Sequence, residues 1–276
     1  MAAGNPSGEL SGESSRRQLL PRPLVIAHRG FSWVAPENTL ASYGLALDAG
    51  AQLFECDVWL SADGVPVVFH DENLERITGV AGRVSDTLLD DLRKLDAGKW
   101  KDASFSEERI PTLAELLEWV QSHSKPSNAL GLVIEIKQDG MAAAALEAIR
   151  MTGTSLDTIT ILGFDVTHLE DLVGLEPRLR CIGLQDDVPG SESARGAILE
   201  KATSVGLRGV GTSVEQFDPE FVAQAHSMGL PIYVWTANEP DDMRKLFDGG
   251  VDALISDRPD LALQIRDERF PEASSD

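Results

Sequence analysis

Short runs of aliphatic and β-branched residues alternate with longer stretches of helical periodicity along most of the chain. The short runs predict strands at residues 24–28, 53–58, 132–137, 158–163, 180–184, 209–213, 232–236 and 253–256. Several of the stretches between them end at a glycine, as helices commonly do. Eight strands that each precede a helix predict an α/β protein with a closed (β/α)8 TIM barrel. An open doubly wound sheet also fits, but it needs a glycine-rich turn after its first strand, and "AHRGF" at residues 27–31 has one glycine.

One region interrupts this alternation. Residues 59–131, between the second and third predicted strands, are far too many for a barrel loop. They begin with Ser-Ala-Asp-Gly, a typical hairpin turn, and with an extended return at residues 65–70. We expect a small insertion between strands 2 and 3, at about residues 71–111. The rest is predicted to be one catalytic barrel domain, residues 23–268, between a mobile N-terminal arm at 1–22 and a mobile tail at 269–276.

Composition narrows the possible partners and the compartment. The chain has a formal net charge of −21, and such an acidic surface repels nucleic acid and anionic lipid. A phosphate-bearing ligand therefore needs local positive charge. Cys56 and Cys181 lack metal-ligand spacing and are expected to be free thiols in a reducing compartment. Residues 1–20 contain no segment of the signal-peptide type, so we expect a cytoplasmic protein without stable membrane association; its oligomeric state is left open.

Charged residues occur where two neighbouring strands should be apolar. Side chains at i and i+2 of a strand share a face, so Glu55 and Asp57 point the same way, as do Glu135 and Lys137. We expect this face to be the barrel interior, at the carboxyl ends of the strands, where barrel enzymes have their active sites. Carboxylates at ~4 Å repel each other by roughly 4 kcal/mol per pair at an effective dielectric constant near 20.

One lysine cannot balance three carboxylates in a confined space. We therefore predict a divalent cation held by Glu55, Asp57 and Glu135, and ligation by oxygen alone favours Mg²⁺ or Ca²⁺ over zinc. The alternative is that these acids form ion pairs with arginines from neighbouring loops.

Two histidines adjoin this predicted metal site. His28 ends the first strand and precedes Arg29, whereas His70 ends the hairpin return. Imidazoles with ordinary pKa values near 6.5 suit a general acid and a general base at neutral pH. Arg29 and Lys137 offer cationic contacts to an anionic substrate. This combination indicates phosphoryl transfer. The other histidines lack such neighbours and are not assigned to the site: His123, His168 and His226.

Several segments, in this order, resemble the glycerophosphodiester phosphodiesterase family over residues 24–262: "AHRG", "PENTLASYGLALDAGA", "FECDVWLSADGVPVVFHDENLERITG", "IPTLAELL", "VIEIK", "IYVWTAN" and "ALISDRPD". The resemblance implies a (β/α)8 barrel, a Mg²⁺ or Ca²⁺ ion, and a small-molecule phosphodiester substrate. The implied reaction is hydrolysis of glycerophosphodiesters, such as glycerophosphocholine and glycerophosphoethanolamine, to sn-glycerol 3-phosphate and an alcohol. It implies these roles: an acid/base pair of His28 and His70, metal ligands Glu55, Asp57 and Glu135, and phosphate contacts from Arg29 and Lys137.

Three other residues in the segments that resemble the family each have two possible roles. Glu37 holds the loop or Arg29, and Asn38 caps a helix or contacts a ligand. Trp235 forms a wall of the substrate pocket or belongs to the core. "LGFD" at residues 162–165 departs from the Ser-Phe of many members, so Gly163 and Phe164 are expected to line a different pocket. Members often carry export or membrane segments, and without one an intracellular recycling role is expected.

Three other functions stay open at this point. A phospholipase D-like enzyme for lysophospholipids or sphingomyelin would need an exposed apolar rim, for which Trp100 and Phe105 are candidates. A non-catalytic anion-binding barrel and a metal-dependent sugar-processing barrel are the others. Within the favoured reaction, either histidine can be the acid, and either water or the adjacent 2-hydroxyl can attack, the latter through a cyclic phosphate.

Overall fold

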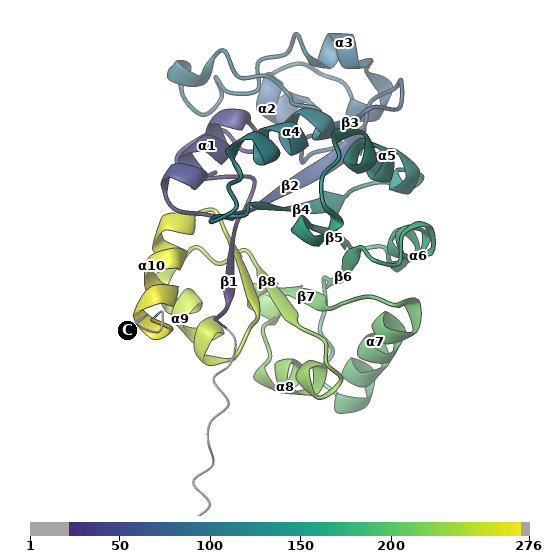
Figure 1. Cartoon of the computed structure of the whole chain (residues 1–276), viewed down its shortest axis with the longest axis vertical. Helices are drawn as coiled ribbons and strands as arrows, with labels where there is room; N and C mark the ends of the chain where they lie inside the picture. Colours follow the sequence, from purple (N-terminus) through teal and green to yellow (C-terminus); the bar gives the residue numbers. More distant parts are fainter. Residues whose placement is uncertain (1–21, 272–276) are drawn as a thin grey trace, which may run out of the picture.

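The computed structural model describes residues 22–271, in which eight parallel strands form a closed barrel (Figure 1). Each strand pairs with its neighbour, and β1 pairs with both β9 and β2, which closes the sheet. The predicted (β/α)8 barrel is therefore confirmed. The strands are β1 (Leu24–Ala27), β2 (Leu53–Leu60), β4 (Gly131–Ile136), β5 (Ile159–Gly163), β6 (Arg180–Gln185), β7 (Val210–Ser213), β8 (Ile232–Trp235) and β9 (Ala253–Ser256).

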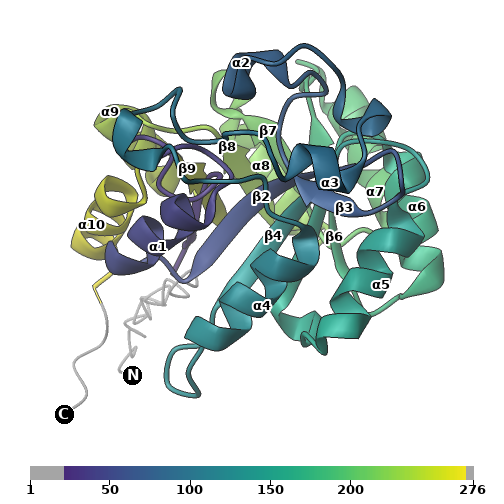
Figure 2. The same ribbon diagram turned by 90° about the horizontal axis from the view of Figure 1, so that it is seen from above.

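Helices surround this barrel (Figure 2). Several begin at side-chain caps: Thr39 accepts a hydrogen bond from Ser42 N at α1, and Thr112 forms a capping box with Glu115 at α4. None of the helices in residues 22–271 has the length and apolar character needed to cross a bilayer. The barrel helices are α1 (Leu40–Asp48), α4 (Leu113–His123), α5 (Ala142–Thr152), α6 (Val166–Leu175), α7 (Glu192–Val205), α8 (Pro219–Ser227), α9 (Pro240–Asp248) and α10 (Pro259–Arg269).

The ends of the chain bear on two further predictions. The arm predicted at residues 1–22 lies outside the described residues except for Arg22, and the tail predicted at 269–276 does so from residue 272 onward. Before that point, α10 continues to Arg269. Phe270 then makes an edge-to-face contact with Phe247, with 6.1 Å between the ring centroids.

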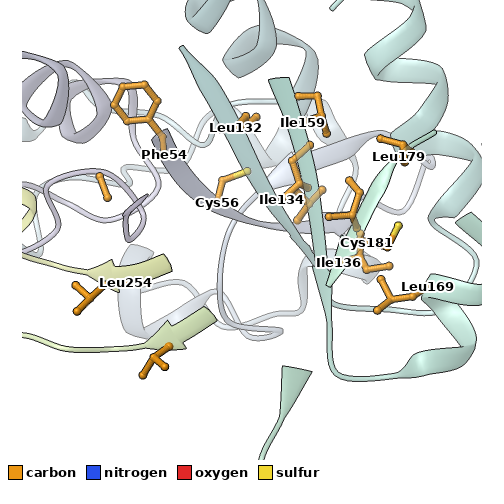
Figure 3. Close-up of a cluster of buried hydrophobic side chains, with 14 of the residues drawn as sticks. Phe54, Cys56, Leu132, Ile134, Ile136, Ile159, Leu169, Leu179, Cys181 and Leu254 are labelled. Carbon is orange, nitrogen blue, oxygen red and sulfur yellow. The ribbon is translucent and has the colours of Figure 1, made fainter. Parts of the chain in front are cut away.

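Alternation along the strands separates two apolar layers. The outward side chains of neighbouring strands, such as Phe54, Cys56 and Ile134, pack into the main core under the helices (Figure 3). Inward apolar side chains, among them Ile26 and Val133, form a second cluster inside the barrel. Glu55 and Asp57 share the inward face with them. The register pairs Asp57 with Glu135 across β2 and β4, so the acids predicted to converge come from adjacent positions of the sheet.

The insertion between the second and third barrel strands has a small core of its own. β2 turns back through Ser61 to Gly64 into the antiparallel strand β3 (Pro66–Val68), and Gly64 has the positive φ of +81° that this turn requires. The short helices α2 (Glu75–Thr78) and α3 (Leu89–Leu92) follow, with single turns at Val84–Asp86 and Ala103–Phe105. Figure 1 shows α2 and α3 together above the barrel strands. The core of the insertion contains Val67, Phe69, Leu74, Ile77, Val84, Leu92, Ala97 and Ile110.

Candidate active site

A cavity of about 120 Å³ brings the predicted site residues together. They come from the carboxyl ends of the barrel strands and from the segment that follows β3. Trp235 forms part of its wall beside Phe164, in an edge-to-face contact with centroids 5.5 Å apart. Gly163, expected to line the pocket with Phe164, instead faces Leu169, so that part of the expectation was wrong. All predicted site residues except the fully buried Asp57 line this cavity: His28, Arg29, Glu55, His70, Glu135, Lys137 and Trp235.

The three predicted metal ligands converge. Carboxylate oxygens of Glu55, Asp57 and Glu135 all lie within 4.8 Å of one another. Burial, together with the neighbouring charge of Asp57, raises the pKa of Glu55 well above its ordinary value and also raises the pKa of Glu135. The ionised forms of these two glutamates are therefore electrostatically costly.

Asp57 is the acid whose charge is balanced. Lys137 Nζ lies 2.9 Å from Asp57 Oδ1, and Arg29 Nε lies 3.0 Å from Asp57 Oδ2. Burial opposes ionisation here, yet these two cations hold the pKa of Asp57 well below its ordinary range. Asn38 Nδ2 also donates to Asp57 Oδ2 at 2.9 Å. Arg29 is thus a second cationic side chain beside Asp57, in addition to Lys137, which was predicted to lie inside the barrel.

The two cationic side chains, Arg29 and Lys137, cannot balance three ionised carboxylates, so one negative charge is left uncompensated. The ion-pair alternative accounts for Asp57 and for the contact of Lys137 with Glu135. It does not account for Glu55, whose only partner among the described ion-pair contacts is the imidazole of His28, with Nε2 3.9 Å from the carboxylate. An all-oxygen donor set with surplus negative charge fits a divalent cation of the Mg²⁺ or Ca²⁺ type.

His28 is oriented by a carboxylate from the far end of the chain. Its Nδ1 lies 2.6 Å from Asp257 Oδ1, and Asp257 also accepts hydrogen bonds from Ser32 Oγ and Asn238 Nδ2. Burial alone would raise the pKa of Asp257, but these hydrogen bonds outweigh it and lower the pKa to about 2. The carboxylate is therefore ionised and accepts hydrogen bonds at neutral pH. Nδ1 of His28 is therefore the donor, and Nε2 points toward Glu55.

His70 has a parallel arrangement in the insertion. Its Nδ1 lies 2.7 Å from Asp71 Oδ1, and its carbonyl accepts a hydrogen bond from Trp59 Nε1 at 2.9 Å. Burial lowers the pKa of His70 below its ordinary value, and the positive charges of Arg29 and Lys137 act in the same direction. The neutral imidazole therefore predominates at pH 7, with Nε2 left for proton transfer.

Glu37 connects the barrel loop to the insertion. It accepts a hydrogen bond from Arg29 at 2.9 Å and another from Arg76 at 2.8 Å. Arg76 in turn donates to Asp71, the partner of His70. Of the two interpretations given for Glu37, the structure shows the contact with Arg29.

Asn38 does not cap a helix, because Thr39 is the N-cap of α1. Its amide instead joins Asp57 to the hydroxyl of Tyr43, which donates to Asn38 Oδ1 at 2.9 Å. With φ of +60°, Asn38 occupies the left-handed region that asparagine tolerates better than most residues. The buried position next to Asp57 therefore explains this residue better than a capping role.

Sequence reasoning gave no role to Asp257, which orients His28. One signal was available, since Asp257 directly follows the last strand, at the barrel end where Glu55 and Asp57 also lie. Asp71 also had a signal, since it directly follows His70. The contact of Arg76 with Glu37 had none, because it depends on how the insertion folds back onto the barrel.

Comparison with known proteins agrees with this geometry. The model of the glycerophosphoryl diester phosphodiesterase family matches residues 28–261. A glycerophosphodiester phosphodiesterase of Caldanaerobacter subterraneus subsp. tengcongensis is 33% identical over 253 residues, covering 88% of this chain and 98% of the relative. Another, of Bacillus subtilis, is 30% identical over 275 residues, covering 93% and 91%.

Solved structures are similar over the same region. An Oleispira antarctica phosphodiesterase in complex with the product sn-glycerol-3-phosphate has a TM-score of 0.80 at 33% identity, covering 89% of this chain and 97% of that one. A Silicibacter pomeroyi protein has a TM-score of 0.81 at 28% identity, covering 90% and 95%. The family match, the relatives and the convergent site agree, and the chain therefore belongs to the glycerophosphoryl diester phosphodiesterase family and is an enzyme of that class.

Proposed function

We propose that this enzyme hydrolyses glycerophosphodiesters, among them glycerophosphocholine and glycerophosphoethanolamine, to sn-glycerol 3-phosphate and an alcohol, by metal-dependent acid/base catalysis. One observation carries the proposal: two carboxylate-oriented imidazoles line one cavity with a carboxylate cluster that holds surplus negative charge. The product found in the Oleispira antarctica relative supports this substrate class.

Glu55, Asp57 and Glu135 would hold the cation, for which their oxygens and uncompensated charge are suited. A cation held there would supply Lewis-acid polarisation of the phosphate and would stabilise negative charge that develops in the transition state. We propose Mg²⁺ or Ca²⁺, because the donor set contains neither sulfur nor imidazole nitrogen.

Arg29 and Lys137 bind the phosphate in this proposal. Both line the cavity, and neighbouring carboxylates outweigh their burial and raise the pKa of each, so they stay protonated. Their present contacts with Asp57 hold their side chains at the cavity wall before substrate arrives. Trp235 and Phe164 offer apolar faces to the carbon backbone of the glycerol.

The two histidines differ in the role that their surroundings favour. His70, held neutral by burial, takes the proton from the attacking hydroxyl, which is water or the adjacent 2-hydroxyl of the substrate. His28, whose Nδ1 donates to Asp257, delivers a proton from Nε2 to the oxygen of the departing alcohol. Bond formation and bond cleavage at phosphorus are thus matched by one proton removed and one proton supplied. Attack by the 2-hydroxyl gives a cyclic phosphate, which water must then open to release sn-glycerol 3-phosphate.

A coupled assay for sn-glycerol 3-phosphate tests the proposal. We expect release from glycerophosphocholine and glycerophosphoethanolamine, loss of activity with a chelator, and recovery on addition of Mg²⁺ or Ca²⁺. His28→Ala and His70→Ala should each lower kcat about 10²–10⁴-fold. His123→Ala, an exposed change on α4, is the matched control. A His70→Ala enzyme with wild-type kcat would remove His70 from the mechanism.

The free, buried thiols of Cys56 and Cys181 support a cytoplasmic location, which we propose along with this activity. The lysophospholipid alternative is less well supported, because the exposed indole of Trp100 is flanked by Arg76 and Lys101 and does not form an apolar rim. Turnover of lysophosphatidylcholine above that of glycerophosphocholine would favour that alternative.

A further inference from the structure

A second cavity adjoins the active site. It has a volume of about 520 Å³, and His28 and Arg29 line both cavities. The second cavity is also lined by Trp33 of the loop after β1, by Trp100 and Lys101 of the insertion, and by two carboxylates. Of these carboxylates, Glu37 is paired with Arg29 and Arg76, and Asp257 is bonded to His28 and Asn238. We call this second cavity the outer chamber.

The shared boundary of the two cavities bears on how a phosphodiester would lie. Arg29, one of the two proposed phosphate contacts, lines both cavities, so a phosphate bound there would direct one ester arm into each of them. The inner cavity of about 120 Å³ is the smaller of the two, which suits a three-carbon polyol. The outer chamber, larger and more open, then receives the alcohol that leaves.

The aromatic rings of the outer chamber already have cations against their faces. The guanidinium of Arg258 lies 5.2 Å from the ring centroid of Trp33. Lys101 Nζ lies 5.7 Å from the ring of Trp100, and Arg76 lies 5.8 Å from it. Aromatic cages bind quaternary ammonium groups through free ring faces. A trimethylammonium group entering here would meet these protein cations, so the chamber is not built for choline.

Lys101 supplies positive charge that no carboxylate neutralises. Arg76 is paired with Glu37 and Asp71. The ammonium of Lys101 donates to the backbone carbonyl of Ser32 at 2.7 Å, and among residues 22–271 no carboxylate lies within ion-pair distance of it. An ammonium has three donors, so two remain for a ligand in the chamber. In a chain with a net charge of −21, such a cation at the mouth of the site attracts anions locally.

We propose that the outer chamber selects glycerophosphodiesters whose leaving alcohol carries an anionic group, and that Lys101 determines this specificity. The proposal rests on the proposed function and adds the substrate class. These substrates share a phosphate or carboxylate group on the leaving alcohol, which accepts hydrogen bonds from the Lys101 ammonium.

The test compares kcat/KM for three substrates at fixed free Mg²⁺ concentration: glycerophosphoinositol 4-phosphate, glycerophosphoinositol and glycerophosphocholine. The first two differ by one phosphate on the leaving alcohol. We expect the phosphorylated substrate to be preferred about tenfold over each of the others, the size of one charge-assisted hydrogen bond. The difference should lie mainly in KM and should shrink as ionic strength rises.

Variants separate the charge of Lys101 from its structural contact. Lys101→Met keeps much of the aliphatic stem but removes the ammonium, and it should reduce the preference for the phosphorylated substrate about tenfold. Lys101→Arg keeps the charge and should retain the preference. Lys99→Met, an exposed lysine two positions away that does not line the chamber, is the control and should behave like wild type.

The outcomes distinguish the two proposals. Equal kcat/KM for the three substrates, or a preference that survives Lys101→Met, overturns the selectivity while the phosphodiesterase proposal stands. A higher kcat/KM for glycerophosphocholine than for both inositol substrates also overturns it. No release of sn-glycerol 3-phosphate from any substrate, with Mg²⁺ or Ca²⁺, overturns both.

Discussion

Asp257 and Asp71 have equivalent positions at the two histidines. Each accepts a hydrogen bond from the Nδ1 atom of its histidine, so each fixes a ring orientation and leaves Nε2 toward the cavity. The two aspartates are held by hydrogen bonds from different parts of the chain. Asp257 accepts from Ser32 and Asn238 of the barrel, whereas Asp71 accepts from Arg76 of the insertion. The two proposed proton-transfer groups therefore depend on different parts of the chain.

We predict that Asp257→Asn lowers kcat about 10- to 100-fold, a typical effect of losing a residue that orients a functional histidine. The amide can present its NH₂ group to Nδ1, which would then have to accept, so the doubly protonated imidazole that donates from Nε2 would lose the carboxylate that stabilises it. KM should change less than kcat, because Asp257 acts through its bond to His28, although its carboxylate also lines the outer chamber. Steady-state kinetics of sn-glycerol 3-phosphate release measure both constants.

The control for this change is Asp241→Asn, because the side chain of Asp241 is 99% exposed on α9. It should leave kcat and the midpoint of thermal unfolding unchanged. An Asp257→Asn enzyme with wild-type kcat would show that the contact with His28 is structural only.

At the scale of elements, the packing of the β1–α1 loop against α1 positions Arg29. Arg29 and Gly30 both have positive φ, +54° and +86°, in a turn that brings the backbone of Gly30 against Ser42. A Cβ atom at Gly30 would lie 2.4 Å from Ser42 Oγ and 2.6 Å from its carbonyl carbon. The close approach therefore requires glycine at this position.

Gly30→Ala should lower the free energy of unfolding by at least about 1–2 kcal/mol, the cost of the left-handed conformation alone, and should lower kcat/KM through displaced Arg29. Gly44→Ala is the matched control in α1, where a Cβ would meet no atom within 4 Å. That change should raise the free energy of unfolding by roughly 0.5–1 kcal/mol. Urea denaturation measures both, and equal effects of the two substitutions would contradict the argument.

The insertion contributes His70 from a core that is separate from the main one. Leu92→Ala removes a fully buried side chain of the insertion, and Leu199→Ala removes one from α7 in the main core. Each should lower the free energy of unfolding by about 2–5 kcal/mol if unfolding is global. Only Leu92→Ala should lower kcat/KM strongly, because local opening of the insertion displaces His70 and Asp71.

Hydrogen exchange of residues 69–76 provides the direct measurement for this prediction. Exchange there should accelerate in Leu92→Ala and stay near wild type in Leu199→Ala. If both variants lost activity in proportion to global stability, the insertion would not be an independent unit.

The barrel strands could be predicted from local patterns of apolar and polar residues in the sequence. Each barrel strand lies within a residue or two of its predicted range, because apolar runs bounded by polar residues are a local signal. The inward direction of Glu55, Asp57 and Glu135 followed from i, i+2 alternation alone. The bond between His28 and Asp257 spans 229 positions, and that between Arg76 and Glu37 spans 39, so neither could be predicted before the topology was known.

For the whole molecule, the acid cluster links cation binding to stability. A cation that binds only the folded chain stabilises it by about 2.7 kcal/mol at a concentration one hundred times its Kd. For a chain of this size the midpoint of thermal unfolding should rise by roughly 5–10 °C when Mg²⁺ or Ca²⁺ is added, and a chelator should reverse the rise. Calorimetry with each cation in turn identifies the preferred one.

The same cluster predicts opposite effects for two substitutions of nearly equal shape. Glu55→Gln removes the uncompensated charge while its amide oxygen still accepts from Arg29 N, so in chelator it should raise the unfolding midpoint and abolish the cation-induced rise. Asp57→Asn instead leaves Arg29 and Lys137 without their shared partner and should lower the midpoint. Glu118→Gln, exposed on α4, should match wild type. If Glu55→Gln destabilised the chelated protein as much as Asp57→Asn, the negative charge would be balanced in the metal-free fold, and the electrostatic case for a cation would be lost.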